Sequence, residues 1–368
     1  MAFNPRMVTL ARDAIGLTQS SLAHQVGVSQ GLISKIENGL EEPTKELLDR
    51  IGQECGVPAL FFQQQDEILG DGLIDYYHKK RLTLPAKPLK KANALANIHR
   101  LEALRLLRTL ELTETATFPV FPVDEHRSVE VIAQLVRATW RVPPGPLPNL
   151  IALIEATGVP IFVVDLGHEK LSAISMPGIN GRHVIILNGS LPPSAQRFAL
   201  AHELAHLIMH GGTASEDMEA EADSFASALL MPADQIRPQL RGLRFKELGA
   251  LKAQWRVSLA ALIRRAHDLD CISDRQYKTY NIQLNHLPGG RKREPGEFEP
   301  ERPRLTKHLL DHYRTELGYS TEDLQTLMVV THERLRTQYL GEPARKLRSL
   351  NVNRALHGVP LHAEAHEH

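Results

Sequence analysis

The sequence is poor in cysteine, in aromatic residues and in long apolar runs. Cys55 and Cys271 are the two cysteines in 368 residues. Two are too few for a disulfide scaffold or a cysteine-based metal site, and they are consistent with a reducing compartment. No apolar run approaches membrane-spanning length, and the N-terminal residues lack the apolar core of a signal peptide. We therefore expect a soluble cytoplasmic protein that makes no membrane contact.

The chain also carries no formal net charge. Lys and Arg together number 43, and Asp and Glu together also number 43. Any binding of nucleic acid must therefore depend on a local patch. One stretch is biased, because residues 78–108 contain nine Lys or Arg and a single acidic residue, Glu102. This segment could attract phosphates, or it could be a solvated helical connector.

Hydrophobic periodicity and Gly- or Pro-rich breaks divide the chain into four predicted parts. The expected fold is α+β and multidomain, with an all-α N-terminal unit, a small mixed-sheet unit and a helical C-terminal extension. In chain order the parts are short helices over 1–65, a basic connector over 66–127 with a long helix from Lys90, a helix-and-strand unit over 128–287, and a charged linker, helical appendage and disordered tail over 288–368.

The stretch ALAHELAHLIMHGG, residues 199–212, contains a potential metal site. On a helix, His202 and His206 lie on one face, one turn apart, where they can share a tetrahedral ion. Glu203 follows the first histidine and can act on a water activated by zinc without being a ligand, so it is the candidate general base. The alternative is a buried helix whose histidines are satisfied by hydrogen bonds.

A catalytic zinc needs a third protein ligand. The next predicted helix, EDMEAEADSFASALLMP, offers Glu219, and Asp223 one turn later could accept the other ring N–H of a ligand histidine. Two competitors remain. His210 continues the four-residue spacing, although three in-line histidines on a straight helix do not easily converge on one ion. Glu221 is two positions from Glu219 and therefore points to a different helix face.

The segments RFALAHELAHLIMHG and EAEADSFASALLMP resemble the ImmA/IrrE metallopeptidases, which are gluzincin-type zinc proteases. The resemblance covers roughly residues 128–285. It implies that His202, His206 and Glu219 bind zinc, that Glu203 is the general base, and that a small mixed sheet packs on the active-site helices.

Three strands are predicted for that sheet, in VPIFVVDL, LSAISMP and RHVIILN. Because extended substrates often pair with an edge strand beside the metal in such proteases, RHVIILN is our candidate edge strand; it could equally be an ordinary half-buried strand. An oxyanion-stabilising group is also expected, and His210, Arg197 and Tyr277 are the candidates.

The N-terminal stretch LTQSSLAHQVGVSQGLISKIENGLEEPTKELLDRIGQECGV resembles the XRE/Cro-type helix-turn-helix domain. Thr18 and Ser29 are expected to cap its two central helices, and Gly27 to make the turn between them. The side chains predicted to contact phosphates or base edges in a major groove are Gln19, Gln30, Ser34 and Lys35.

The alternatives are a generic helical bundle or a helix-turn-helix used for protein contact. Residues 1–60 carry five basic and seven acidic residues, which is an unusual surface for an electrostatic DNA binder. Further along, ELGYSTEDLQTLMVVTHERL faintly resembles a second helix-turn-helix but lacks the turn glycine, so we interpret it as a packing appendage. The histidine-containing tail HGVPLHAEAHEH is expected to be disordered rather than a metal site.

Three functions are consistent with these features. The first is a DNA-binding zinc metalloprotease that cleaves a regulatory protein, such as a helix-turn-helix repressor, and the intact Glu203 favours it. The second is a transcriptional regulator whose zinc unit senses a ligand or peptide with little proteolysis. The third is a phage-type or toxin–antitoxin interaction module. Since helix-turn-helix proteins usually read paired half-sites, a homodimer is expected.

Overall fold

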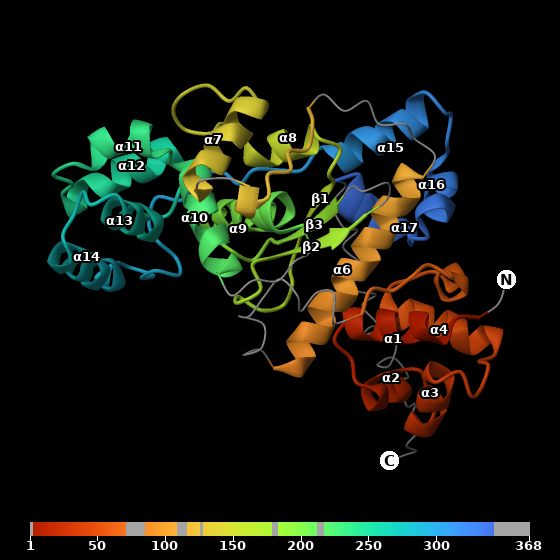
Figure 1. The fold of residues 1–368 in the computed structure, drawn as a ribbon. Coiled ribbons are helices and arrows are strands. Elements are labelled where there is room, and N and C mark those ends of the chain that lie inside the picture. The colour runs from red at the N-terminus through yellow and green to blue at the C-terminus, as the bar shows by residue number, and fades with distance from the viewer. Residues whose placement is uncertain are drawn as a thin grey trace, which may run out of the picture.

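The computed structural model describes residues 3–70, 85–108, 116–125, 128–178, 183–211 and 217–341. These residues are mostly helical, with one three-stranded sheet near the centre of the molecule (Figure 1). An N-terminal helical bundle lies at one end, and the long helix α6 lies between this bundle and the sheet. The expected α+β architecture with helical N- and C-terminal parts is confirmed.

The N-terminal bundle contains α1 (Pro5–Ala14), α2 (Gln19–Gln25), α3 (Gln30–Glu37), α4 (Lys45–Cys55) and the 3-10 helix η1 (Ala59–Gln63). As predicted, Thr18 and Ser29 cap α2 and α3, with side-chain oxygens that accept hydrogen bonds from the N–H groups of Ser21 and Leu32 at 3.1 and 3.2 Å. Gly27 adopts the predicted turn conformation with φ of 69°, a region that glycine enters without a steric penalty.

Helix α6 (Ala86–Leu107) begins one turn earlier than the predicted start at Lys90. The reason is local: Pro85 is the N-cap and Pro88 falls within the first turn. At that position the missing N–H of proline has no intrahelical partner to lose.

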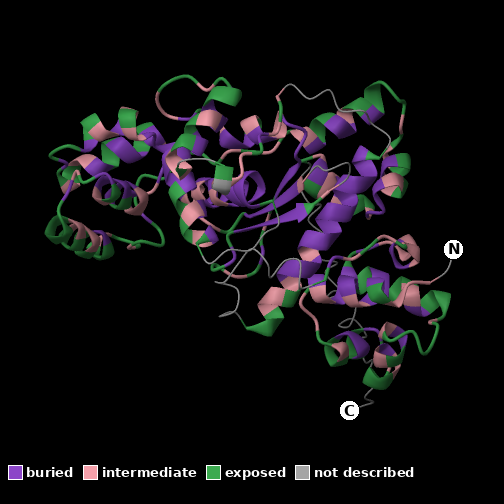
Figure 2. Ribbon diagram, viewed as in Figure 1, coloured by how far each residue is buried: buried purple, intermediate pink, exposed green. Residues whose placement is uncertain are grey.

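The later turns of α6 are buried, as Figure 2 shows. Arg105 donates hydrogen bonds to the carbonyl of Met328 at 3.0 Å and to the carboxylate of Asp66 at 2.8 Å. Arg100 is also buried and donates to two backbone carbonyls. These two arginines neither face solvent nor point to a phosphate, so both interpretations of the basic stretch are wrong for this part. Residues 78–84 of the stretch lie outside the described residues.

The sheet contains β1 (Ile161–Val164), β2 (Ala173–Pro177) and β3 (His183–Asn188), in the order β1-β3-β2. β3 pairs with β1 in parallel and with β2 antiparallel. The prediction that RHVIILN forms an edge strand is therefore wrong, because β3 is the central strand. Its run of four apolar residues, Val184 to Leu187, is the pattern of a strand that is covered on both faces.

Both faces of β3 are indeed covered. Ile185 and Leu187 belong to a core that includes residues of the two site helices, α9 (Pro193–Ala205) and α10 (Met218–Leu230). Val184 and Ile186 belong to a second core with residues of α6 and the C-terminal helices. The sheet is thus the middle layer between the site helices and the rest of the molecule.

The remaining helices of this unit lie beside the site helices, and the last four of them gather at the end of the molecule opposite the N-terminal bundle (Figure 1). Helix α9 continues into a π-helical turn, η4 (His206–His210), and ends at Gly211 with φ of 49°. Helix α10 packs against α9 and α7. The others are the 3-10 helix η3 (Val123–Glu125), α7 (Val129–Thr139), α8 (Leu150–Glu155), α11 (Ala233–Leu240), the 3-10 helix η5 (Phe245–Glu247), α12 (Leu248–Trp255), α13 (Leu259–Asp268) and α14 (Asp274–His286).

Residues 288–304, predicted as a charged linker, pack against this unit, and we call them the glutamate strap. Three of its carboxylates each reach the N-terminus of a helix, where unpaired N–H groups and the helix dipole favour negative charge. Glu294 accepts from the N–H of Leu259 and Ala260 in α13, Glu297 from the N–H of Ser194 in α9, and Glu301 from the N–H of Ile151 in α8.

The C-terminal helices are α15 (Leu305–Thr315), α16 (Thr321–Met328), α17 (His332–Arg334) and the π turn η6 (Leu335–Tyr339). They repeat the N-terminal helix-turn-helix at a constant offset of 302 residues, with Ser320 and Thr331 as caps in the places of Thr18 and Ser29. At the position of Gly27, Val329 adopts φ of 58°. A non-glycine residue thus takes the turn conformation here, and apolar side chains of these helices pack on the core shared by α6 and the sheet.

Candidate metal centre

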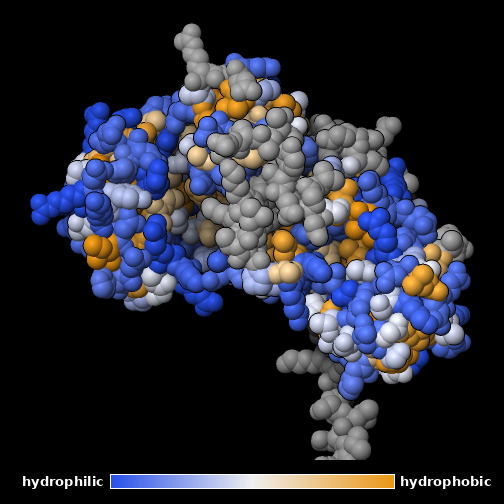
Figure 3. All heavy atoms as spheres, turned by 60° about the horizontal axis from the view of Figure 1, so that its bottom comes forward, coloured by the Kyte–Doolittle hydropathy of each residue, from blue (hydrophilic) through white to orange (hydrophobic). Residues whose placement is uncertain are grey.

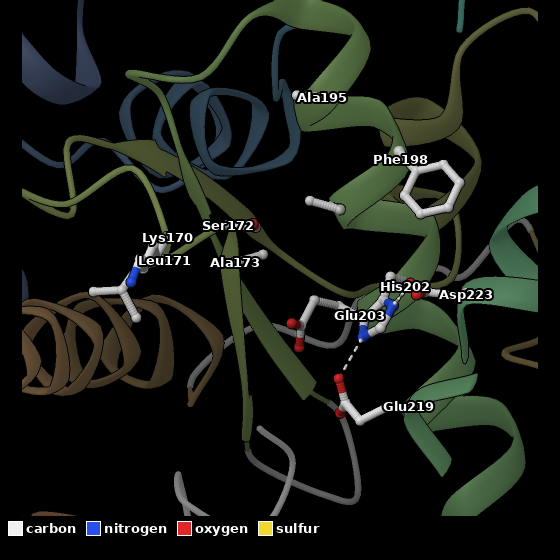
Figure 4. A pocket seen from close by; sticks show the side chains of 11 residues that line it. Lys170, Leu171, Ser172, Ala173, Ala195, Phe198, His202, Glu203, Glu219 and Asp223 are labelled. Carbon is white, nitrogen blue, oxygen red and sulfur yellow. Dashed lines mark hydrogen bonds and ion pairs between the residues drawn. The ribbon is translucent and has the colours of Figure 1, made fainter. Parts of the chain in front are cut away.

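Helices α9 and α10 bring together the three side chains predicted to bind metal. The Nε2 atoms of His202 and His206 lie 3.1 Å apart. The Glu219 carboxylate lies 3.7 Å from His202 Nε2 and 3.4 Å from His206 Nε2. One donor atom from each residue lies within 4.8 Å of the other two. Figure 4 shows His202 and Glu219 pointing into the same space.

Asp223 fixes the orientation of His202. Its Oδ1 lies 2.8 Å from His202 Nδ1. Because an ionised carboxylate can only accept, Nδ1 carries the proton and the Nε2 lone pair faces the other ligands. Burial lowers the pKa of His202, but the hydrogen bond to Asp223 and the charge of Glu203 raise it overall.

The donor set fits a divalent zinc ion. Two imidazole lone pairs and a carboxylate converge at short range, and such an arrangement of negative potential is stable when a cation lies between the donors. Two nitrogens and one oxygen are also the ligand types that zinc takes in catalytic sites, which keep a fourth position open.

The two competitors for the third ligand position contact each other instead. His210 Nε2 lies 3.0 Å from Glu221 Oε2, and His210 Nδ1 lies 3.0 Å from His206 Nδ1. Both side chains are thus on the far side of the His206 ring from Glu219. Burial and the neighbouring His206 lower the pKa of His210, although Glu221 acts in the opposite direction.

Glu203 lies on α9 with 2% of its surface exposed. Ser175 of β2 donates a hydrogen bond from its hydroxyl to Glu203 Oε2 at 2.9 Å. Figure 4 shows the Glu203 carboxylate pointing toward the space beside His202 and Glu219. Ser175 is not among the predicted site residues, although the sequence carries a signal for it: this serine shares the period-2 face of Ala173 within an otherwise apolar strand.

A cavity of about 240 Å³ opens beside these groups. Phe198 and Ala199 provide apolar wall, and Lys170 provides a cationic side chain across the cavity from His202 (Figure 4). The edge strand β2 borders it through Ala173. The full lining is Lys170, Leu171, Ser172, Ala173, Ala195, Phe198, Ala199, His202, Glu203, Glu219 and Asp223.

The three oxyanion candidates are not in this lining. Arg197 is buried behind α9, where it pairs with Glu301 and donates to the carbonyl of Leu147. His210 is paired with Glu221, as described above. Tyr277 on α14 lies against the ring of His267, with ring centroids 4.5 Å apart. Among the residues that line the cavity, Lys170 is the cationic one.

The four predicted DNA contacts lie on α2 and α3. Gln30 donates to Gln19 Oε1 at 2.9 Å, and Gln19 donates to Glu37 Oε2 at 2.7 Å. Lys35 is exposed and lies 3.4 Å from Glu41, and Ser34 is half-buried. The surface of this bundle mixes hydrophilic and apolar residues (Figure 3).

Comparison with known proteins finds family matches for two segments of the chain. A helix-turn-helix family model matches residues 10–62, and the model of the IrrE N-terminal-like domain, Peptidase_M78, matches residues 154–267. The second range includes Ser175, the three potential ligands and Glu203.

Two relatives share long segments with the chain. The HTH-type transcriptional regulator RamB of Mycobacterium tuberculosis is 25% identical over 305 residues, which cover 70% of this chain and 63% of RamB. The chain thus spans less than two thirds of that relative. The DNA translocase FtsK of Pasteurella multocida is 23% identical over 255 residues, 68% of this chain but 26% of FtsK.

No helix among the described residues is long and apolar enough to span a bilayer. The family matches agree with the geometry, since the capped helix pair and the potential metal site fall in separate matched ranges. The chain joins an XRE-type helix-turn-helix domain to an IrrE N-terminal-like domain of the Peptidase_M78 family.

Proposed function

We propose that this chain is a DNA-binding zinc metalloendopeptidase that cleaves a regulatory protein. The observation that carries the proposal is the contact between Ser175 and Glu203 beside the metal-ligand cluster. A cluster that only bound metal would not need a buried glutamate aimed at its open side. His202, His206 and Glu219 would hold the ion, with Asp223 orienting His202.

When bound, zinc would lower the pKa of water and polarise a peptide carbonyl. Glu203 would accept the proton of the attacking water and pass it to the leaving amine. Ser175 holds one carboxylate oxygen of Glu203, so the other can face the substrate. Lys170 is our candidate for stabilising negative charge at the carbonyl oxygen, because it is the cation of the cavity lining.

We propose that an extended substrate lies along β2 rather than β3. β2 is the edge strand next to α9, and Ser172 and Ala173 border the cavity. Addition of a strand to a sheet edge supplies main-chain hydrogen bonds while side-chain pockets supply specificity. A polypeptide would thereby be held with one carbonyl beside Glu203.

The test compares the unmodified protein with Glu203→Gln and with Glu247→Gln, a matched change on the exposed helix η5. Each is loaded with zinc and incubated with helix-turn-helix repressors encoded nearby and with a mixture of quenched fluorescent peptides. We expect zinc near one per chain in all three and cleavage by all except Glu203→Gln. Zinc binding without any cleavage would contradict the proteolytic function, and the absence of zinc binding would contradict the site itself.

The N-terminal domain is proposed to bind DNA as a homodimer through α3. Gln30 and Ser34 would contact base edges, while Gln19 and Lys35 would contact phosphates. Gln30→Ala should reduce discrimination between selected and random duplexes, whereas Lys35→Ala should weaken binding to both alike. Equal binding of all duplexes by the unmodified protein would contradict sequence-specific reading.

A sensor function is the second candidate. RamB is named a transcriptional regulator, and its similarity to this chain covers 70% of the chain. In that case the zinc site would bind a peptide or ligand with little turnover. Such a protein would change its DNA affinity when that ligand is added, and Glu203→Gln would leave this response intact.

A further inference from the structure

We propose that Glu221 and His210 act together to hold His206 in the tautomer and ring orientation that bind zinc. This inference rests on the proposed zinc-peptidase function. It gives a role to two residues that lie beside the site but contribute neither a ligand nor a base. Both would be positioning residues, since each acts through His206.

The four groups form a continuous chain of contacts. Glu221 Oε2 lies 3.0 Å from His210 Nε2, and His210 Nδ1 lies 3.0 Å from His206 Nδ1. The opposite nitrogen of the His206 ring, Nε2, lies 3.4 Å from the Glu219 carboxylate. His206 is fully buried and His210 is 6% exposed. Water therefore has little access to the two imidazoles, and the 3.0 Å separation of the two Nδ1 atoms requires one of them to donate to the other.

The positions of those protons follow from Glu221. A carboxylate accepts, so His210 must present N–H from Nε2, and its Nδ1 is left with a lone pair. That lone pair accepts the Nδ1–H of His206, and the His206 Nε2 lone pair then faces Glu219 and His202. The reverse arrangement would direct the His210 Nε2 lone pair at the Glu221 carboxylate, which is repulsive.

Each ligand histidine is thereby oriented by a carboxylate of α10. Asp223 contacts His202 directly at 2.8 Å, whereas Glu221 reaches His206 through His210. Glu221 can do so because its helix face differs from that of Glu219, the feature that makes it a poor third ligand. One helix thus supplies a ligand and both orienting groups, so zinc affinity should depend on Glu221 as it does on Asp223.

The experiment measures zinc dissociation constants by competition with a chromophoric chelator, using the full chain. Disruptive variants are Glu221→Ala and His210→Leu, and conservative ones are Glu221→Gln and His210→Gln, whose amide oxygens can still accept. The matched control is Asp274→Ala, which breaks a surface histidine–carboxylate pair, His267–Asp274, at 2.7 Å. Thermal unfolding of the metal-free forms checks that each variant folds.

We expect the disruptive variants to lose about tenfold or more in zinc affinity, as orienting partners of metal ligands typically do. The conservative variants should lose less, and Asp274→Ala should match the unmodified protein. The double variant Glu221→Ala/His210→Leu should bind zinc no more weakly than His210→Leu alone, because Glu221 acts only through His210. Additive losses would contradict the proposal by showing two independent structural effects.

Failure of the inference differs from failure of the proposed function. If the unmodified protein binds no zinc, both are wrong. If it binds zinc and Asp223→Ala weakens binding while the Glu221 and His210 variants do not, only this inference is overturned. Should His210→Leu fail to fold, Glu221→Ala decides the matter, since the Glu221 side chain is 23% exposed and its loss leaves a smaller buried gap.

Discussion

Replacing Glu294 by alanine should destabilise the peptidase domain, although this residue lies in a segment rich in Gly, Pro and charge. The Glu294 carboxylate accepts the N–H groups of Leu259 and Ala260 at 2.6 and 3.0 Å. It also lies 3.0 Å from the ammonium of Lys252, and both side chains of this ion pair are at most 2% exposed. The substitution removes all three interactions.

The expected loss in the free energy of unfolding depends on which polar groups lose their partner when Glu294 is removed. Removing one partner of a buried ion pair costs about 3–5 kcal/mol when the other charge is stranded. Here Lys252 keeps Glu297 at 2.5 Å, which reduces that cost. The two N–H groups at the start of α13 lose their acceptor, at about 1–3 kcal/mol each. We therefore expect a loss of about 3–5 kcal/mol in the free energy of unfolding.

Urea denaturation followed by tryptophan fluorescence measures this loss, because Trp255 ends α12 and is 1% exposed. Glu294→Gln should cost about 2 kcal/mol, since its amide oxygen can still accept an N–H. The control is Glu169→Ala, which breaks the exposed pair that Glu169 forms with Lys292 of the same strap and should leave stability unchanged. A loss below about 1 kcal/mol for Glu294→Ala would refute the reasoning and restore the interpretation as a loose linker.

Two further predictions concern the site and the core of the molecule. Ser175→Ala should reduce the rate of peptide cleavage about tenfold without changing zinc affinity, because a hydrogen bond worth roughly 1.4 kcal/mol positions Glu203; an unchanged rate would mean that α9 alone positions the base. Burial raises the pKa of Glu102, but Arg334, His99 and Tyr339 lower it to about 2, below its ordinary 4.5. A depressed carboxyl pKa contributes stability above about pH 4.5 that is lost as the pH falls toward 2, here about 3 kcal/mol. Glu102→Gln should therefore flatten the acid limb of the stability–pH curve, and an unchanged limb would contradict the assignment.

Features set by neighbouring residues were predictable from the sequence. Caps at Thr18 and Ser29 and the turn at Gly27 depend on contacts within a few positions. The convergence of His202 and His206 depends on helical spacing alone, and the approach of Glu219 was expected from its place on the next helix. The structure brings these groups together, while their roles as ligands remain predictions.

Features set by distant contacts were not predictable. Glu294 is 35 residues from the helix terminus that it caps, and nothing local separates such a glutamate from a solvated one. Val329 is a second feature that could not be predicted from nearby residues. The missing turn glycine argued against a helix-turn-helix at the C-terminus, yet Val329 is 6% exposed and belongs to the N-terminal core cluster. Burial of its side chain offsets the cost of the left-handed conformation, which is roughly 1–2 kcal/mol.

The wrong prediction of an edge strand also comes from contacts between residues that are distant in sequence. The prediction rests on RHVIILN alone, whereas its four consecutive apolar residues are the pattern of a strand that is covered on both faces. The helices that cover its second face come from α6 and the C-terminal region, which are far away in sequence. The strand order could not be read from any one strand.

Helix α6 lies within residues 66–127, the segment that was predicted to connect two separate domains. Its Ile98 and Leu101 belong to the core of the N-terminal bundle, while Ala103 and Leu106 belong to the core beneath the sheet. One rigid helix is thus part of both cores, so the DNA-binding and peptidase domains should unfold together. Far-UV circular dichroism follows all helices, whereas Trp140 and Trp255 report on the peptidase domain alone.

The two signals should therefore change at one temperature, and Leu101→Ala should shift both. Leu101 is 1% exposed, so the substitution removes about 2–5 kcal/mol by opening a cavity in the N-terminal core. If that core unfolded independently, the variant would move only the part of the circular dichroism change that comes from the N-terminal helices, and the tryptophan transition would stay in place. A shared shift would mean that α6 couples the stability of the DNA-binding domain to that of the sheet bordering the candidate metal site. Such coupling is the physical requirement for DNA contact to regulate the proposed protease.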